Sequence, residues 1–268
     1  MENIKASVII TSYNHANSIA RAIDSVLSQK TTFNFYIVVI DDGSNDGSKE
    51  ILKEYYNNKS IQNLSVISFE NNQGLMQAYK VGFECCIGEY IAVCDCDDRW
   101  CDEFKLQKQV DYMEAHPECG MCHTNAYSET FGVDGLREMN YPLGATYETM
   151  LKGNSYICAT TMCFRRNFMD FDRILKKKFY VWDYPILLHM IRRCKFHKLN
   201  DFTAINVVHG ESVTHTKKRM PRLRYVLGIF RIKSYYIVRY GCKLDTMLYV
   251  IYKLTRDILS IILKRWYK

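Results

Sequence analysis

The chain has 268 residues, 48% of them hydrophobic, which suits one large α/β domain with or without an appendage. Its net charge of +7 is uneven, because residues 217–268 hold 14 Lys and Arg against two acids and leave the first 216 residues mildly acidic. This asymmetry indicates an anionic partner, either a membrane surface or nucleic acid. No stretch of about 18 apolar residues occurs, so we expect no spanning helix. No apolar leader follows Met1, and eleven cysteines, an odd number, fit free thiols in the cytoplasm.

The first half of the sequence alternates strand and helix patterns. Apolar residues at helical spacing predict a helix capped by Asn17 or Ser18, a second with Tyr55 and Tyr56 on its inner face, and a third over 75–86. Short apolar runs, typical of buried parallel strands, occupy residues 6–10, 36–40, 64–69 and 90–94. Repeated units of this kind predict an α/β fold with a doubly wound, mostly parallel sheet flanked by helices. Its binding crevice is expected at the carboxyl ends of the strands.

Residues 120–208 mix the two patterns, with strands expected at 160–164 and 203–208 and a helix at about 183–194. We interpret them as the second half of the same domain, which ends near residue 216. Beyond it, two helices are expected near 220–240 and 245–266. Residues 217–268 are therefore predicted to form a basic, amphipathic helical tail.

An acidic run, Asp95-Cys96-Asp97-Asp98, directly follows the strand expected at 90–94. Carboxylates so close together repel one another unless a cation or hydrogen-bond donors neutralise them. Oxygen ligands on a turn suit Mn²⁺ or Mg²⁺, which take their remaining ligands from substrate phosphates and water. A solvated acidic turn is the commoner fate of a single D-x-D pattern, but the buried strand before this one favours a metal site.

A second acidic strand end is Asp41-Asp42-Gly43-Ser44. A plain turn explains it when it is taken alone, because Asp and Ser cap helices and Gly accepts a positive φ. In a parallel sheet, however, this strand end lies at the same edge as the acidic run. A carboxylate there can accept hydrogen bonds from a base or a ribose.

Five segments, in this order and at these spacings, resemble the inverting glycosyltransferases of family 2. They are VIITSYN at 8–14, DDGS at 41–44, NQG at 72–74, GEYI at 88–91 and DCDD at 95–98. The resemblance covers residues 4–215 and implies the GT-A fold, a nucleotide-sugar donor and transfer of a sugar to an acceptor hydroxyl. UDP is the commonest nucleotide in the family and is the one we expect. Residues 1–216 would then be the GT-A domain, with a nucleotide-sugar-binding half at about 1–119 and an acceptor half at 120–216.

The resemblance also implies roles for individual residues. Thr11 and Tyr13 lie where the family holds the nucleobase, Tyr13 by stacking. Asp42 would bind the base or the ribose, and Asp95 would contact the ribose and the shell of the metal. Asp97 corresponds to the direct ligand of Mn²⁺ or Mg²⁺.

On the acceptor side, Asp183 matches the general base of the family, which is usually the Asp of a Glu-Asp pair before an apolar helix. Trp182 replaces the usual Glu, and Asp183 also suits the start of a helix with Pro185 in its first turn. His209 resembles the first residue of a late His-x-x-Ser element near the diphosphate or metal. An isolated His is more often a structural residue.

The predicted location of the protein in the cell depends on the tail. Its apolar residues recur at helical spacing with Lys and Arg between them, as in helices that lie in an anionic membrane interface. The alternative is packing on the catalytic domain or on a second subunit, so a homodimer stays open. With membrane binding, we expect a peripheral protein at the inner face of the cell membrane. Its acceptor would be a glycan or lipid-linked glycan in surface polysaccharide synthesis.

The competing function is a non-catalytic protein that binds membrane or nucleic acid through its basic tail. That reading leaves the two carboxylate clusters unexplained. They would repel nucleic acid phosphates unless a metal were present, so we expect no nucleic acid partner.

Overall fold

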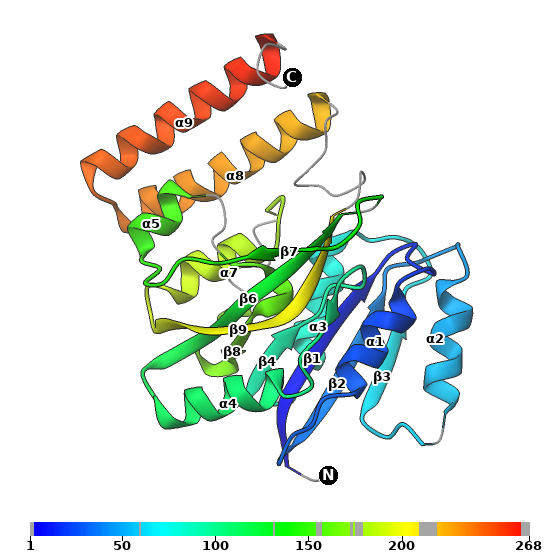
Figure 1. Ribbon diagram of the computed structural model, residues 1–268. Coiled ribbons are helices and arrows are strands. Elements are labelled where there is room, and N and C mark those ends of the chain that lie inside the picture. Colours follow the sequence, from blue (N-terminus) through cyan, green and yellow to red (C-terminus); the bar gives the residue numbers. More distant parts are fainter. Residues whose placement is uncertain are drawn as a thin grey trace.

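The structure is a computed structural model that describes residues 3–58, 60–130, 132–153, 157–171, 174, 179–208 and 219–263. These residues form one curled sheet with helices on both faces and a pair of long helices at one end (Figure 1). The strand order is β3-β2-β1-β4-β8-β6-β9-β5, with β7 paired to β6. The predicted α/β fold, with a mostly parallel sheet flanked by helices, is confirmed.

The first half of the chain follows the predicted alternation closely. Its elements are β1 (Ile4–Ser12), α1 (Ile19–Leu27), β2 (Asn34–Asp41), α2 (Ser48–Asn57), β3 (Leu64–Ser68), α3 (Leu75–Cys85) and β4 (Tyr90–Val93). Strands β3, β2, β1 and β4 are neighbours in that order, and each pairs in parallel with the next. Their carboxyl ends therefore meet at one edge of the sheet.

Alternate residues of β1 supply two separate cores. Ile9 packs on the face covered by α3, whereas Val8 and Ile10 pack on the face covered by α1, and all three are fully buried. Both faces of such a strand are buried, so its side chains do not alternate between apolar and polar. The sequence of β1 is therefore a nearly continuous apolar run.

The inward position predicted for Tyr56 is wrong, since 67% of its side chain is exposed. Helix α2 packs against α1 through Tyr55, whose hydroxyl donates to the Asp24 carboxylate at 2.6 Å. Tyr56 is the next residue around the helix, about 100° away, and this rotation turns it to solvent.

The second half of the chain adds antiparallel strands to the sheet. Its elements are β5 (Arg99–Trp100), α4 (Lys105–Ala115), β6 (Cys119–Thr130), β7 (Leu136–Met139), α5 (Tyr147–Lys152), the 3-10 turn η1 (Ala159–Thr161), β8 (Cys163–Arg165), the 3-10 turn η2 (Arg166–Phe168), α7 (Asp183–Met190) and β9 (Lys195–Val208). Strand β8 is antiparallel to both β4 and β6, while β6 and β9 are parallel. The strand expected at 160–164 is thus a 3-10 turn followed by a short strand, and the helix expected to reach about 194 ends at Met190.

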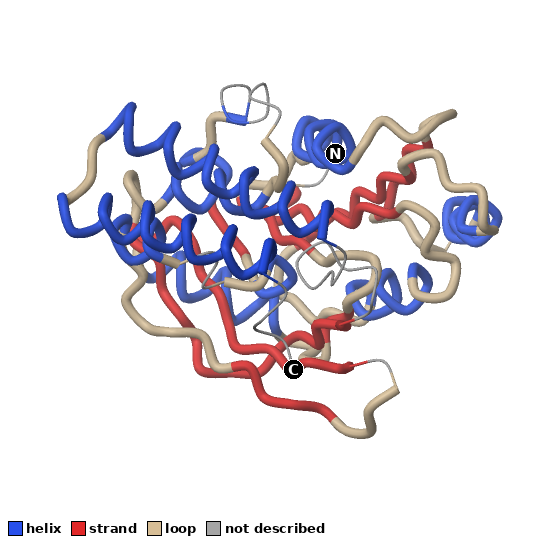
Figure 2. Tube along the Cα trace, turned by 90° about the horizontal axis from the view of Figure 1, so that it is seen from above, coloured by secondary structure: helices blue, strands red, loops and turns tan. Residues whose placement is uncertain are grey.

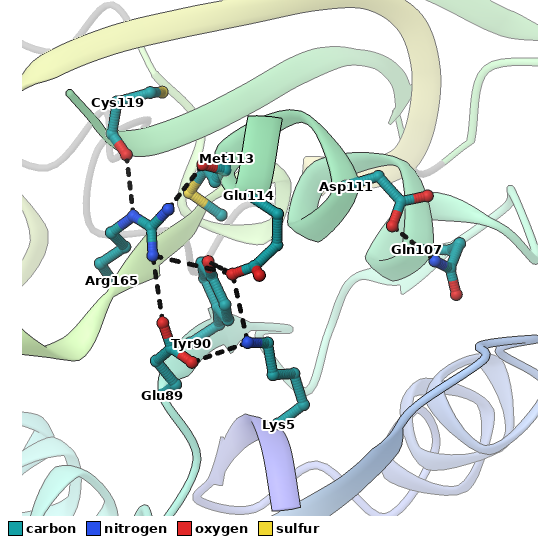
Figure 3. A network of polar contacts seen from close by, with 9 residues as sticks. All are labelled: Lys5, Glu89, Tyr90, Gln107, Asp111, Met113, Glu114, Cys119 and Arg165. Atoms are coloured by element: carbon teal, nitrogen blue, oxygen red, sulfur yellow. Dashed lines mark hydrogen bonds and ion pairs between the residues drawn. The ribbon is translucent and has the colours of Figure 1, made fainter. Parts of the chain in front are cut away.

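At the edge of the sheet that holds the amino ends of β1 and β4, a polar network joins four elements (Figure 3). Arg165 donates to Glu89 at 3.1 Å and to the carbonyl oxygen of Met113 at 2.5 Å. Lys5 forms ion pairs with Glu89 at 2.8 Å and with Glu114 at 3.2 Å. The network links β1, the start of β4, β8 and α4, so the first and second halves are fastened together at this edge.

The tail contains the two predicted helices, α8 (Arg219–Tyr240) and α9 (Leu244–Leu263). Helix α8 packs on α7, with Ile232 and Tyr236 buried, and the Tyr236 hydroxyl donates to the Pro185 carbonyl at 2.7 Å. Helix α9 lies against α8 and α5, and the two long helices run side by side when the molecule is seen from above (Figure 2). Among the described helices, none combines the length and the apolar character that crossing a membrane requires.

Candidate active site

The carboxyl ends of β1, β2 and β4 surround a cavity of about 480 Å³. Its lining includes the five residues that the resemblance assigns to donor and metal, namely Thr11, Tyr13, Asp42, Asp95 and Asp97. The parallel order β2-β1-β4 brings these residues together from three separate segments of the chain. What each of them binds stays a prediction.

A wider hollow of about 1070 Å³ lies at the opposite edge of the sheet, beside Ile4, Asn34 and Ile87. No carboxylate is among the described residues that line it. A site for a metal and a diphosphate needs charged oxygen ligands, so the smaller acidic cavity is the better candidate.

Asp42 is held in place by the backbone of two loops. Its N–H donates to the Ser12 carbonyl at 2.8 Å, and its carboxylate oxygens accept from the N–H groups of Gln73 at 2.7 Å and Gly74 at 2.9 Å. Gly43 follows with a φ of +74°, and a Cβ there would lie 2.4 Å from the Asn71 carbonyl carbon. Only glycine fits this close approach. Asp42 therefore organises the wall of the cavity, a role that the sequence analysis did not include.

The mouth of the cavity is shaped by the loop after β1. Asn14 has a φ of +57°, its N–H donates to the Ser44 hydroxyl at 2.9 Å, and its side chain accepts from the Asn45 N–H at 2.9 Å. These bonds tie the loop after β1 to the loop after β2. They hold Tyr13 at the cavity with 44% of its surface exposed, while Thr11 is buried deeper. An exposed ring in this position can stack on a planar base.

The acidic run places two half-buried carboxylates, Asp95 and Asp97, in the cavity wall. Burial, and then the charge of Asp97, raise the pKa of Asp95 to about 7, whereas a hydrogen bond from the Tyr79 hydroxyl acts in the opposite direction. A divalent cation beside this pair would offset their repulsion.

Asp98, the last residue of the acidic run, is not among the residues that line the cavity. It is almost fully buried, and it accepts from the Val207 N–H at 2.8 Å and from the Asn206 amide at 3.1 Å. Burial, followed by the charges of Asp97 and Asp95, raises the pKa of Asp98 well above its usual range. The residue joins the end of the acidic run to β9.

Across the described residues, no group of three or more His, Cys, Asp or Glu side chains could hold a metal ion. The pair Asp95 and Asp97 fits the kind of site in which a few carboxylates hold the ion and substrate phosphates and water complete its shell. His209, the other predicted metal residue, lies outside the described residues.

The predicted base, Asp183, begins α7 next to the cavity. The Tyr184 N–H donates to its carboxylate at 2.8 Å, and burial raises the pKa of Asp183 above its usual range. The charge of Asp183 is also one of the causes that raise the pKa of Asp95, so the two carboxylates lie within electrostatic reach of each other. The preceding Trp182 is itself part of the cavity lining.

Sequence reasoning assigned no role to Tyr79, Trp182, His15 or Asn72. Three of them line the cavity, and Tyr79 reaches it through Asp95. Nothing in the sequence marks the two aromatic residues, because an aromatic side chain at helical spacing is normally a core residue. Only the fold brings them to the acidic cluster.

A sequence model of the family described as glycosyl transferase family 2 matches residues 7–173. An Escherichia coli protein named UDP-Glc:alpha-D-GlcNAc-diphosphoundecaprenol beta-1,3-glucosyltransferase WfaP is 29% identical over 237 residues, which cover 86% of this chain and 88% of that protein. Uncharacterized proteins of Mycobacterium bovis and Mycobacterium tuberculosis are 32% identical over 136 residues. Those matches cover 51% of this chain, which spans only 38% of the length of each mycobacterial relative.

Two solved structures resemble nearly the whole chain. Staphylococcus aureus TarS 1–349 in complex with UDP gives a TM-score of 0.66 at 18% identity, covering 97% of this chain and 71% of that one. The mannosyltransferase PcManGT from Pyrobaculum calidifontis, in complex with GDP-Man and Mn²⁺, gives a TM-score of 0.64 at 15% identity, covering 97% and 74%. These likenesses confirm the GT-A fold.

Proposed function

The chain belongs to glycosyltransferase family 2, and from this premise we propose that it transfers a sugar from a UDP-sugar to the hydroxyl of a lipid-linked glycan with inversion at the anomeric carbon. The observation that carries the proposal is the acidic cavity, in which Asp95 and Asp97 form part of the wall and Asp183 lies within electrostatic reach. A donor, a cation and a base would meet there.

The donor is proposed to lie along the ends of β1 and β2. Tyr13 stacks on the base, Thr11 lies beneath it, and Asp42 accepts from the base or ribose with the lone pairs that its loop bonds leave free. UDP is favoured because the WfaP name specifies a UDP-sugar and TarS has been solved with UDP and with UDP-GlcNAc. GDP-Man in PcManGT makes GDP the alternative to test.

Mn²⁺ or Mg²⁺ is proposed as the cofactor, held by Asp97 with Asp95 in its shell and with His209 near the metal or diphosphate. When bound, such an ion neutralises the negative charge of the departing diphosphate. The raised pKa of Asp95 supports the proposal, because a carboxylate destabilised by burial and by a like charge gains from a nearby cation. PcManGT, solved with Mn²⁺, has the same fold.

Asp183 is proposed as the general base. Its carboxylate takes the proton of the acceptor hydroxyl while that oxygen forms a bond to the anomeric carbon. The bond from the anomeric carbon to the diphosphate breaks on the opposite face, and the nucleoside diphosphate leaves with the electron pair. A base with a raised pKa accepts the proton more readily near neutral pH. Trp182, 4% exposed, excludes water beside it.

The acceptor is proposed from the name of one relative. WfaP is named for a sugar on diphosphoundecaprenol, and its match spans most of both chains. We therefore propose a lipid-linked sugar of surface polysaccharide synthesis as the acceptor, with the enzyme in the cytoplasm at the inner face of the membrane. The proposed site is built from residues of a single copy of the chain.

Calorimetric titration of UDP and GDP in Mn²⁺ and then in EDTA, followed by UDP release from a panel of UDP-sugars, tests the proposal. We expect Mn²⁺-dependent binding of one nucleotide, lost in Asp97→Asn and kept in the surface control Asp111→Asn. Among the residues that the structure describes, Asp111 accepts only from Gln107 on its own helix, at 2.7 Å. If a folded protein bound neither nucleotide in Mn²⁺, the non-catalytic interpretation of the tail would replace this one.

A further inference from the structure

The outer face of α9 is an exposed apolar stripe. Six large side chains recur along it at helical spacing, each between 47% and 67% exposed: Leu244, Leu248, Ile251, Tyr252, Leu259 and Ile262. We call these residues the α9 stripe. Single exposed apolar residues are ordinary, but six along one face of a helix, interrupted at Thr255, mark an interaction surface.

The stripe is not the side by which α9 joins the domain. That side carries Thr246 and Val250, both buried against the rest of the protein. Lys152 on α5 pairs with Asp245 at 2.6 Å, and Arg219 at the start of α8 donates to the Ile262 carbonyl at 3.2 Å. Helix α9 is therefore fixed at both ends with the stripe facing outward, and it forms the outermost layer in Figure 1.

The neighbouring helix α8 adds positive charge. It contains six Lys and Arg and no acid. Its exposed residues alternate apolar and basic side chains at helical spacing, from Met220 through Arg224, Leu227 and Arg231 to Val238. Neither Arg224 nor Arg231 forms an ion pair with another described residue, so both cations can meet an external anion. The two helices lie side by side when the molecule is seen from above (Figure 2).

We propose that the α8–α9 hairpin docks on the surface of an anionic lipid bilayer, with the α9 stripe in the interface and Arg224 and Arg231 on lipid phosphates. Apolar side chains flanked by cations have the chemistry of such a surface, because the apolar groups enter the interface and each nearby Lys or Arg is attracted to the anionic headgroups. This proposal rests on the proposed function in one respect: a lipid-linked acceptor would lie at the same membrane surface.

A second copy of the chain is the competing occupant of the stripe. In a two-fold dimer the same patch meets itself. The arginines of α8 would then approach those of the other copy without an acid on that helix to offset them. An anionic bilayer attracts these arginines, so the charges favour a lipid surface over a second copy of the chain.

Vesicle co-sedimentation of the full chain tests the proposal, with vesicles of phosphatidylglycerol and phosphatidylcholine and vesicles of phosphatidylcholine alone. We expect preferential binding to the anionic vesicles, weakened roughly tenfold or more by Leu248→Glu/Ile251→Glu. The control Tyr56→Glu/Ile87→Glu adds the same charge at exposed apolar sites on α2 and beside Ile4, and it should bind as the unmodified protein does. Arg224→Gln/Arg231→Gln should weaken binding at low salt and lose its effect at high salt.

Three outcomes would overturn the proposal: no binding to anionic vesicles, binding that the stripe variant leaves unchanged, or a dimer in sedimentation equilibrium that the stripe variant dissociates. UDP binding in Mn²⁺, measured on the same variants without vesicles, keeps the two proposals separate. If the stripe variant binds UDP but not vesicles, the loss is at the membrane surface. If neither the unmodified protein nor any variant binds UDP, the proposed activity is wrong, and the vesicle result is unaffected.

Discussion

The ring of Trp182 stacks on the ring of Tyr79, with 3.8 Å between the centroids and 20° between the planes. Tyr79 comes from α3, in the first half of the domain, and its hydroxyl donates to Asp95. Trp182 comes from the second half and directly precedes Asp183. The pair thus joins the proposed donor side of the site to the proposed base.

Tyr79→Phe should weaken the binding of Mn²⁺ and UDP while preserving the stack. The change removes the donor that orients Asp95, and a hydrogen bond to a charged group contributes about 1.5–3 kcal/mol, or roughly 10- to 150-fold in affinity. Calorimetry at several Mn²⁺ concentrations should show that more Mn²⁺ is needed. Tyr236→Phe is the matched control, since its buried hydroxyl donates to the backbone carbonyl of Pro185 and not to Asp95 or Asp97. Equal Mn²⁺ requirements in both variants would mean that Tyr79 has only a structural role.

Asp183→Asn and Asp97→Asn should separate chemistry from binding. Loss of a general base lowers turnover by roughly 10²–10⁴-fold, so Asp183→Asn should keep nucleotide affinity and lose kcat. Asp97→Asn should lose both, because the cation serves donor binding as well as the reaction. Steady-state kinetics together with calorimetry measure the two effects, and near-normal turnover in Asp183→Asn would refute its assignment.

Gly43→Ala should destabilise the protein more than Gly144→Ala does. Both glycines have a positive φ, but a Cβ at Gly43 meets the backbone of Asn71 whereas one at Gly144 meets nothing within 4 Å. Strain alone costs about 1–2 kcal/mol, and the clash adds about 1–3 kcal/mol. Urea denaturation measures the difference. UDP binding should also fall in Gly43→Ala, because the loop that Asp42 holds must move.

Lys233 on α8 should make stability depend on pH. It is 3% exposed, and burial followed by the charge of Lys253 lowers the pKa of Lys233 to about 7. The unfolded chain keeps this proton up to about pH 10.5, so between the two values unfolding takes up a proton and stability rises with pH.

Lys233→Met should remove this dependence and raise stability at pH 7 by about 1 kcal/mol or more, because no charge is then buried. Urea denaturation at pH 7, 8 and 9 compares the slopes. An unchanged slope in the variant would assign the pH dependence to another group, such as Lys105, whose pKa burial lowers to about 8.

The first half of the fold was predictable because β1, β2 and β4 are largely buried on both faces, and because β2 and β4 lead into acidic residues. The second half was less so. Strand β9 begins at Lys195, whereas the sequence predicted a strand only from 203, because residues 195–201 are mainly polar. Their strand conformation comes from pairing with β6, and such a contact between distant segments leaves no periodic pattern in either one.

The residues of the candidate site also form two groups, one that the sequence could predict and one that it could not. Thr11 lies at the end of β1, and Tyr13, Asp42, Asp95 and Asp97 follow strand ends, so strand order places them at one cavity. Tyr79 lies in α3 and Trp182 directly precedes α7, both at positions where the sequence pattern suggests core. In α9, apolar residues occupy both sides of the helix, and the pattern could not tell the side that meets α8 from the side that faces outward.

The buried carboxylate of Asp98 has a consequence for how the domain unfolds. Through Asn206 and Val207 it binds the end of β9 to the turn that follows β4, while Arg165 and Glu89 bind the two halves at the far edge of the sheet. The two halves cannot separate without breaking buried hydrogen bonds at one edge and an ion pair at the other. The two halves should therefore melt in one cooperative transition, with a single midpoint for probes placed in either one.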